Sequence, residues 1–180
     1  SKFPIANRWG YFPAAALAWR LSDEPFMASA KSWLDNLKVR LSYGESGADN
    51  ISSSLWKDVW TPSTATVNGV VVTTYIPGSL LPNPDLKWET TISRNLGIDF
   101  GFWNNRLSGT VEIYYNTNKD LLLRVPVDVT TGYQYQYQNM GKTSNKGIEL
   151  SLNAGIIKSK DFNLKAGINY NYNINKIEQL

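Results

Sequence analysis

Long stretches of strict apolar and polar alternation constrain this chain more than any other feature. The stretch FNLKAGINYNYNINKI begins at residue 162 and keeps apolar side chains on one parity and Asn, Lys and Gly on the other through residue 175. Successive side chains of a strand point to opposite faces, so the stretch predicts a strand with one apolar and one polar face. The pattern recurs at 37–44, 92–102, 107–116 and 148–156, and more weakly at 12–21. We therefore predict six long antiparallel strands.

These strands are longer than those of ordinary soluble domains. Globular strands average about five to six residues, whereas a tilted strand needs about nine to eleven residues to cross a bilayer. The predicted apolar faces carry one charge, Arg94, and the opposite faces carry Arg20, Lys38, Arg40, Glu89, Asp99, Glu112, Glu149 and Lys165. A soluble sandwich also segregates charge in this way. Combined with long strands, the segregation favours the wall of a transmembrane barrel, with hydrocarbon outside and a wet polar lumen inside.

The predicted connections alternate in length, which is typical of an up-and-down meander whose two ends do different jobs. Short periplasmic connections are expected at about 22–36, 103–106 and 158–161, and long extracellular loops at about 44–87 and 119–146. In the first short connection, DEPFMASAKSWL predicts a helix with Pro25 in its first turn and with Asp23 and Glu24 as capping residues. In the first long loop, VVVTTYI at 70–76 predicts a hairpin strand that packs on other loops.

Aromatic residues provide an independent check on the barrel prediction. They make up 13% of the chain, with seven Trp and ten Tyr. Tyr115 follows Leu107 by eight residues, and Tyr170 follows Phe162 by eight. Eight tilted residues climb roughly 20 Å, close to the roughly 25 Å apolar band of membrane barrels. The predicted lower girdle is Phe100, Phe102, Trp103 and Phe162, the upper girdle is Tyr43, Tyr115, Tyr170 and Tyr172, and Arg94 is expected just above the band, near lipid phosphates.

Composition excludes several function classes for this segment. Because the chain has no Cys and no His, it can form no disulfide, no thiolate or imidazole metal site, and no Ser-His or Cys-His pair. We expect no enzyme activity, no metal and no cofactor. The net charge of +3 is too small and too scattered to indicate nucleic-acid binding. No apolar run approaches the roughly 18 to 20 residues that a spanning helix needs.

Four stretches of the chain match one known family: NRWGYFPAAALAWRLSDEPFM, LKVRLSYGESGADNI, LPNPDLKWETTISRNLGIDFGFWNNRLSGTVEIYYNTNKDLLL and NMGKTSNKGIELSLN. In these stretches the chain resembles the barrel of SusC/RagA-type TonB-dependent outer-membrane transporters. The most specific part is Asn83 to Glu89 followed by the hairpin through Asn104 to Leu107. The resemblance implies a Gram-negative outer-membrane location and a barrel of about 22 strands, of which this chain supplies about six.

The resemblance also implies a function and partners. Such transporters import glycans or oligopeptides with a SusD-like surface lipoprotein, and TonB energises them through a plug and TonB box that lie in an N-terminal part missing from this segment. Six strands with two open edges would leave backbone groups unpaired in lipid. We therefore expect residues 1–180 to form a single partial barrel segment of a chain several times longer.

Aromatic side chains in the long loops are the candidate substrate-binding residues, because aromatic faces suit stacking on sugar rings. They are Trp56, Trp60, Tyr75, Tyr133, Tyr135 and Tyr137. Loop self-packing, girdle anchoring and contact with the lipoprotein are the competing roles for these residues. On the lumenal face, Asp99, Glu112 and Glu149 are expected to pair with Lys38, Arg40 and Lys165.

Two other functions compete with transport. One is an outer-membrane barrel enzyme with its nucleophile elsewhere in a longer chain. The other is a soluble β-sandwich that binds carbohydrate through the same aromatic loops. A sandwich would enclose Leu96, Val111 and Ile168 inside a two-layered body, whereas a barrel wall would leave them exposed.

Overall fold

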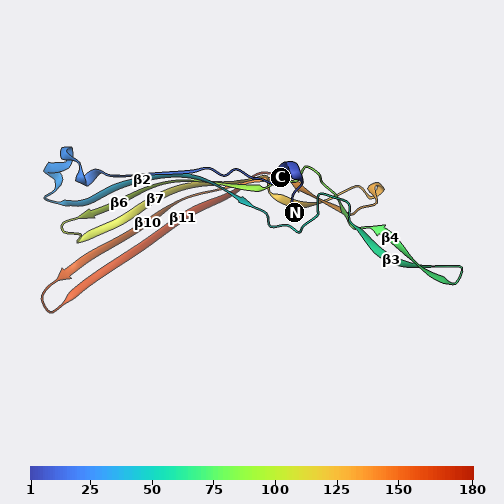
Figure 1. Ribbon diagram of the computed structural model, residues 1–180. Coiled ribbons are helices and arrows are strands. Elements are labelled where there is room, and N and C mark those ends of the chain that lie inside the picture. The colour runs from blue at the N-terminus through green and yellow to red at the C-terminus, as the bar shows by residue number, and fades with distance from the viewer.

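The computed structural model describes residues 1–180 and is dominated by one antiparallel sheet (Figure 1). Its strand order is β1-β2-β6-β7-β10-β11, so the main strands are neighbours in the order in which they occur along the chain. They are β1 (Ala14–Arg20), β2 (Leu34–Ala48), β6 (Glu89–Phe102), β7 (Leu107–Lys119), β10 (Lys142–Lys158) and β11 (Asn163–Gln179). The prediction of six antiparallel strands is confirmed: five of them have 13 to 17 residues, and β1 is shorter, with seven. The sheet is open at β1 and β11.

Smaller elements occupy the connections. The first long connection contains β3 (Trp60–Val67), which pairs with β4 (Val70–Pro77), and β5 (Leu80–Leu81). The second contains β8 (Leu122–Pro126) and β9 (Tyr135–Asn139), and β9 lies between β5 and β8 in a three-stranded sheet. The remaining elements are the 3-10 helices η1 (Ile5–Asn7), η2 (Leu21–Asp23), η3 (Pro25–Ala30) and η4 (Val129–Thr131). None of the helices is long and apolar enough to cross a membrane.

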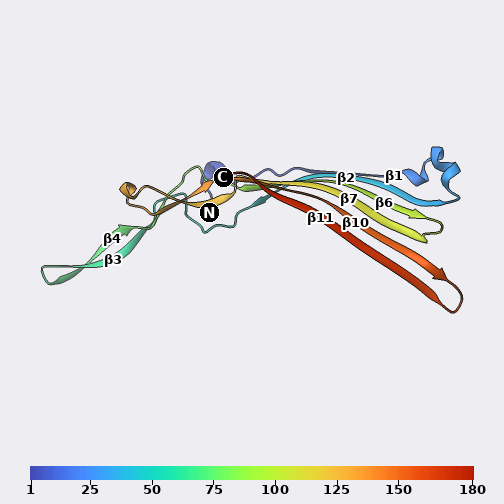
Figure 2. The same ribbon diagram turned by 180° about the vertical axis from the view of Figure 1, so that it is seen from behind.

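The two ends of the sheet differ in what they carry. The short connections between β1 and β2, β6 and β7, and β10 and β11 lie together at one end (Figure 1). Both long connections and both termini lie at the other end, and the β3–β4 hairpin extends away from the sheet (Figures 1 and 2). The molecule is therefore a long wall with all of its extended loops at one end.

Strand register puts most of the large apolar side chains of the main strands on one face. Leu41 pairs with Leu96, Leu96 with Ile113, and Ile113 with Ile148. Directly paired residues of antiparallel strands point to the same side of the sheet. The next row toward the short connections is Val39, Ile98, Val111, Leu150 and Tyr170. The alternation seen in each strand thus becomes one continuous apolar face, which we call the outer face, and one polar face.

The outer face is not covered by a second layer. Leu96, Ile113 and Ile168 are 42%, 51% and 62% exposed, although a sandwich core would bury them. Only 12 of 180 residues are buried, too few to enclose the sheet in a core of its own. The soluble sandwich is therefore ruled out for this segment.

Compared end to end, from Tyr43 to Tyr170 and from Phe102 to Phe162, the aromatic girdles slant across the hydrogen-bonded rows in the same direction, although Tyr43 and Tyr115 share one row. Tyr43 lies in the row of Ile174, so Tyr170 is four residues lower on β11, four strand steps away. Phe102 lies in the row of Ala166, so Phe162 is also four residues lower, three strand steps away. Four residues rise about 13 Å and each step is about 4.8 Å, which gives slants of about 35° and 43°. A shared strand tilt of about 35–45° produces this pattern.

The turn between β6 and β7 adopts an unusual backbone. Trp103, Asn104 and Asn105 have φ values of 54°, 57° and 55°, in the left-handed region that Asn tolerates better than most residues. The Trp103 amide donates to the Trp33 carbonyl at 2.8 Å, and the Asn105 amide donates to the Asp35 carboxylate at 2.9 Å. The neighbouring connection therefore holds this hairpin in place.

The connection between β1 and β2 is helical but is not capped as expected. η3 starts at Pro25, in agreement with its predicted first turn, but it is a 3-10 helix whose N-cap, Glu24, makes no side-chain capping bond. Instead Glu24 accepts a hydrogen bond from the Trp19 indole at 2.9 Å, and Asp23 pairs with Arg20 at 3.5 Å. Both carboxylates bind the end of β1, so the capping prediction is wrong.

A small buried cluster ties the N-terminal segment to the long-loop end of the sheet. Phe3, Ile51 and Leu86 form it, and Trp88 packs against it with its ring centroid 5.0 Å from that of Phe3. Leu86 is 0% exposed. Asn7 donates to the carbonyl of Leu86 at 3.2 Å and fixes the segment from its other side.

We predict that Leu86→Ala opens this cluster without disturbing the sheet. Removing a fully buried Leu side chain costs about 2–5 kcal/mol, and such a local loss is felt mainly in the same cooperative unit. Hydrogen exchange of the full-length protein should accelerate at residues 3–7 and 51–56 and stay slow in β6 and β7. Val129→Ala, at an exposed position, is the matched control. Equal acceleration in the strands would contradict the prediction.

Candidate functional site

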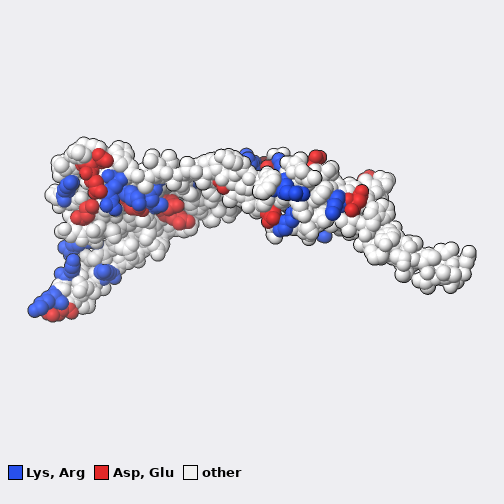
Figure 3. Space-filling model, in the orientation of Figure 1, with Lys and Arg blue, Asp and Glu red and all other residues white.

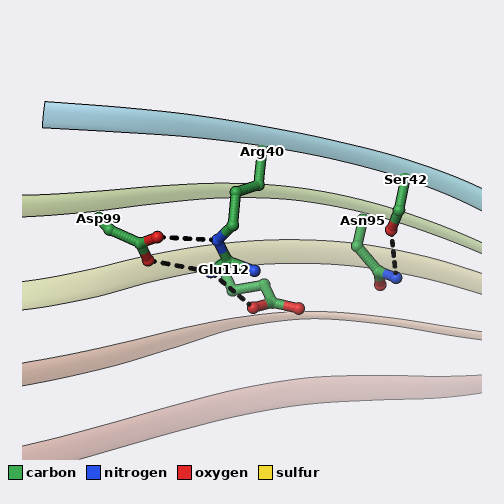
Figure 4. Close-up of polar contacts among 5 residues, drawn as sticks. All are labelled: Arg40, Ser42, Asn95, Asp99 and Glu112. Atoms are coloured by element: carbon green, nitrogen blue, oxygen red, sulfur yellow. Dashed lines mark hydrogen bonds and ion pairs between the residues drawn. The ribbon is translucent and has the colours of Figure 1, made fainter. Parts of the chain in front are cut away.

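The polar face of the sheet carries an ion-pair cluster centred on Arg40. Its Nε donates to Asp99 Oδ2 at 2.9 Å and its Nη2 donates to Asp99 Oδ1 at 3.0 Å, which makes a bidentate pair (Figure 4). The same Nη2 reaches Glu112 Oε2 at 3.4 Å. Arg40 therefore links three adjacent strands, β2, β6 and β7. All three side chains are about a quarter to a third exposed, so this cluster adds to stability only modestly.

Gly97 makes it possible for the Arg40 side chain to extend across β6 to Glu112. The alternation pattern of the sequence does not identify this glycine. In the paired register it lies between Arg40 and Glu112. A Cβ at this position would stand 2.7 Å from Arg40 Nη2 and 2.9 Å from Cζ, closer than such atoms approach. The missing side chain leaves room for the guanidinium to lie over β6. Knowledge of the register would have been needed to find it.

Other polar-face side chains form hydrogen bonds between strands. Asn95 donates to Ser42 at 3.1 Å (Figure 4), and Thr91 donates to Asn118 at 2.9 Å. Of the ion pairs expected on the lumenal face, the structure contains Arg40–Asp99 and Arg40–Glu112. Glu149 instead accepts from Asn171 at 3.2 Å, and Lys38 and Lys165 make no ion pair. Figure 3 shows charges of both signs gathered toward the short-connection end and again among the loops.

The six loop aromatics do not form one cluster. Trp56 and Tyr137 both pack against the buried cluster of Phe3, Ile51 and Leu86. The Trp56 indole also donates to the Ser1 carbonyl at 3.2 Å. These two side chains therefore fit the self-packing alternative better than ligand stacking.

Trp60 and Tyr75 do lie together, on the β3–β4 hairpin. Trp60 is two residues from Pro62, which pairs with Tyr75, so both rings occupy one face in a diagonal position. They are 56% and 65% exposed. On the opposite face, Val70 and Ile76 are 62% and 50% exposed, so the expected packing of this hairpin on other loops is wrong. The hairpin extends away from the sheet and presents its aromatic face to solvent.

Tyr133 and Tyr135 lie on the second long connection. The Tyr133 hydroxyl donates to Asp58 at 3.2 Å, and partial desolvation and then this bond raise the pKa of Tyr133. The guanidinium carbon of Arg124 lies 4.4 Å from the ring centroid of Tyr135, in cation–π contact. Asp128 accepts bonds from the Thr130 amide and hydroxyl, which lower the pKa of its carboxyl. These contacts join the two long connections and order the second.

An open groove of about 670 Å³ lies where the two long connections meet. Its lining is mixed, with Lys57, Thr61 and Gln134 among polar residues and Leu55 and Ile76 among apolar ones. Thr61 pairs with Ile76 on the hairpin face opposite the Trp60–Tyr75 pair. Neighbours of the predicted aromatics thus line the groove, and the aromatics themselves do not. Its size is in the range of small-molecule sites, and no group of His, Cys, Asp or Glu suited to a metal is present.

Comparison with known proteins agrees with the geometry. The family model described as "TonB dependent receptor-like, beta-barrel" matches residues 2–179. Over the whole chain, TonB-dependent receptor P26 of Formosa agariphila and TonB-dependent receptor SusC of Bacteroides thetaiotaomicron are each 36% identical. The solved RagAB peptide importer in its open-open state matches with a TM-score of 0.86 at 33% identity, over 100% of this chain and 19% of that one.

An open, single-layered antiparallel sheet of long strands, with one exposed apolar face and one polar face, has the construction of the wall of an outer-membrane β-barrel. The chain belongs to the TonB-dependent receptor β-barrel family, and within it resembles SusC and the RagAB importer, as predicted. It spans about a fifth of the length of the curated relatives it matches, 18% of SusC, so it corresponds to a segment of such a barrel. The curated relatives are described as TonB-dependent receptors, and the solved RagAB protein is described as a peptide importer.

We predict that Gly97→Ala uncouples Arg40 from Glu112. The new methyl group would displace the guanidinium, and the longer bond, to Glu112, should break before the bidentate pair with Asp99. Glu112→Gln should then cost about 0.5–1 kcal/mol in the wild-type background and close to nothing in Gly97→Ala. Equilibrium unfolding in detergent of the full-length wild-type protein, the two single variants and the double variant measures this coupling. Strictly additive effects would show that Gly97 has no such role.

Proposed function

We propose that this chain forms part of the barrel wall of a TonB-dependent outer-membrane transporter that imports glycans or oligopeptides. The observation that carries the proposal is the outer face: an uncharged apolar band continues across all six strands and remains exposed. Lipid is the solvent that such a face requires, while the ion-paired face suits a water-filled lumen. The segment itself supplies no chemistry; it holds the loops and closes the lumen.

The orientation follows from the difference between the two ends of the sheet. In outer-membrane barrels the turns are short on the periplasmic side and the loops are long on the extracellular side. We assign the short connections at about 22–36, 103–106 and 158–161 to the periplasm. The connections at about 44–87 and 119–146, with the groove and the β3–β4 hairpin, then face the outside, where a solute arrives.

Partners and substrate class follow from the resemblance. The solved RagAB protein is a peptide importer, and a SusD-like lipoprotein is the partner expected for a transporter of the SusC type. The exposed aromatic face of the hairpin and the Lys57, Thr61 and Gln134 side chains of the groove could contact either sugars or peptides. TonB would act through the N-terminal part of the longer protein. An outer-membrane enzyme remains the competing function, and family membership favours transport.

We predict that Val111→Arg destabilises the full-length barrel in bilayers. Val111 lies midway between Leu107 and Tyr115 on the outer face, and Arg near a bilayer midplane costs about 2–4 kcal/mol. Thr110→Arg introduces the same residue one position earlier on the polar face, close to Asp99, and should change the free energy of unfolding by less than about 0.5 kcal/mol. Equal losses in unfolding from lipid vesicles would contradict the lipid assignment.

We predict that Trp60→Ala and Tyr75→Ala weaken substrate binding at the extracellular end. Each exposed ring can contribute about 0.5–1.5 kcal/mol of stacking, so each variant should bind about two- to tenfold more weakly. Calorimetry of the full-length protein with its lipoprotein, against panels of oligosaccharides and oligopeptides, measures this and identifies the class. Phe26→Ala, exposed at the opposite end in η3, is the control. Unchanged affinity in both loop variants would remove the hairpin from the substrate site.

A further inference from the structure

The outer face changes character at the long-loop edge of its apolar band. Arg94 pairs with Tyr43 on one side and with Tyr115 on the other, and Tyr115 pairs with Lys146. These four side chains therefore form one row on the same face as the apolar band. Below this row the paired positions of the outer face carry no charge. Within the row, two cations, Arg94 and Lys146, flank Tyr115.

Rows farther toward the loops extend the positive charge. By the same register, Lys119, Lys142 and Lys176 lie on this face, against the carboxylates Glu45 and Glu178. Cations thus outnumber carboxylates on the outer face above the band. The polar face differs, because its charges are mixed and its arginines are paired with carboxylates: Arg40 with Asp99 and Glu112, and Arg20 with Asp23.

The two carboxylates of the outer face are already engaged. Glu178 pairs with Lys176 at 2.7 Å and accepts from Ser144 at 2.8 Å. Glu45 accepts a hydrogen bond from the hydroxyl of Tyr43. Neither carboxylate is therefore available to neutralise Arg94 and Lys146, and the row of Tyr43, Arg94, Tyr115 and Lys146 keeps its positive charge.

Arg94 and Lys146 have no carboxylate partner. Arg94 donates to the neutral hydroxyl of Thr117 at 3.4 Å. Its guanidinium carbon lies 5.9 Å from the ring centroid of Tyr43 and 5.5 Å from that of Tyr115. The two rings hold the guanidinium in place by cation–π contact without neutralising it. Lys146 forms no ion pair and is exposed.

We propose that Arg94 and Lys146 bind the phosphate of an anionic lipid headgroup in the outer leaflet, on the outside of the barrel. The inference rests on the proposed membrane setting. Girdle tyrosines sit at headgroup level. The upper edge of the apolar band passes just below Arg94 and farther below Lys146, so both cations lie in the headgroup layer rather than in hydrocarbon. The cations stand two strands apart, about 10 Å between their Cα atoms, and their long side chains can converge over Tyr115. Arginine binds phosphate through two N–H groups and lysine as a point charge.

The test compares lipid retention by the full-length protein in detergent, using native mass spectrometry with lipid A that carries its phosphates and lipid A from which they have been removed. The double variant Arg94→Gln, Lys146→Gln should bind the phosphorylated lipid about 30-fold more weakly, since each cation near a charged lipid surface contributes about 1 kcal/mol. The control Lys38→Gln, Lys165→Gln removes the same charge from the polar face and should bind as the wild type does. Lipid A without phosphates should bind weakly and equally to all three proteins.

Each outcome decides the proposal. Equal retention of phosphorylated lipid by the double variant and the wild type, or an equal loss in the control, overturns it while leaving the barrel and its transport function intact. Outer-membrane fractionation of the wild-type protein is the separate measurement: if the full-length chain is absent from that membrane, the proposed function and this inference fail together. A selective loss in the Arg94, Lys146 variant supports the site.

Discussion

Backbone hydrogen bonding in a single fixed register is the constraint on which the rest of this structure depends. In a strand the side-chain period is two, so a slip of one residue would move a whole strand's apolar set to the polar face. The observed register avoids this across all six strands, with Leu41, Leu96, Ile113 and Ile148 in one row. Because no buried core supports the sheet, the backbone ladder and the surrounding solvent on each face must do so instead.

The same register determines what the polar face can do. Arg40 reaches two carboxylates on neighbouring strands because Gly97 leaves an opening between them. On the outer face, Arg94 is held between Tyr43 and Tyr115 by the same kind of cross-strand placement. One arginine is neutralised by acids beside a polar lumen, and the other is only positioned by rings. The difference reflects the medium each face requires.

The sequence predicts the fold well wherever the two faces meet different media. Alternation locates the six strands and their apolar faces, because lipid and water impose opposite demands on adjacent residues. It fades toward the loops, where β10 starts at Lys142 and where both faces are wet, so pairing continues without alternation. The loops are harder to predict. Trp56 packs against the cluster of Phe3, Ile51 and Leu86, whereas Trp60 is exposed on the β3–β4 hairpin. Contacts between residues distant in sequence decide this difference, and no local pattern encodes them.

The slant of the girdles explains why a charge in an otherwise apolar pattern could not be interpreted from one strand. In β6 alone, Arg94 interrupts the apolar face four residues above Ile98. Across the sheet, the upper edge of the apolar band descends from Tyr43 on β2 to Tyr170 on β11, so it passes just below Arg94 and farther below Lys146. Both cations then lie above the hydrocarbon, where a charge costs little. Strand tilt, which becomes visible only when strands are paired, turns an apparent interruption into the start of the headgroup layer.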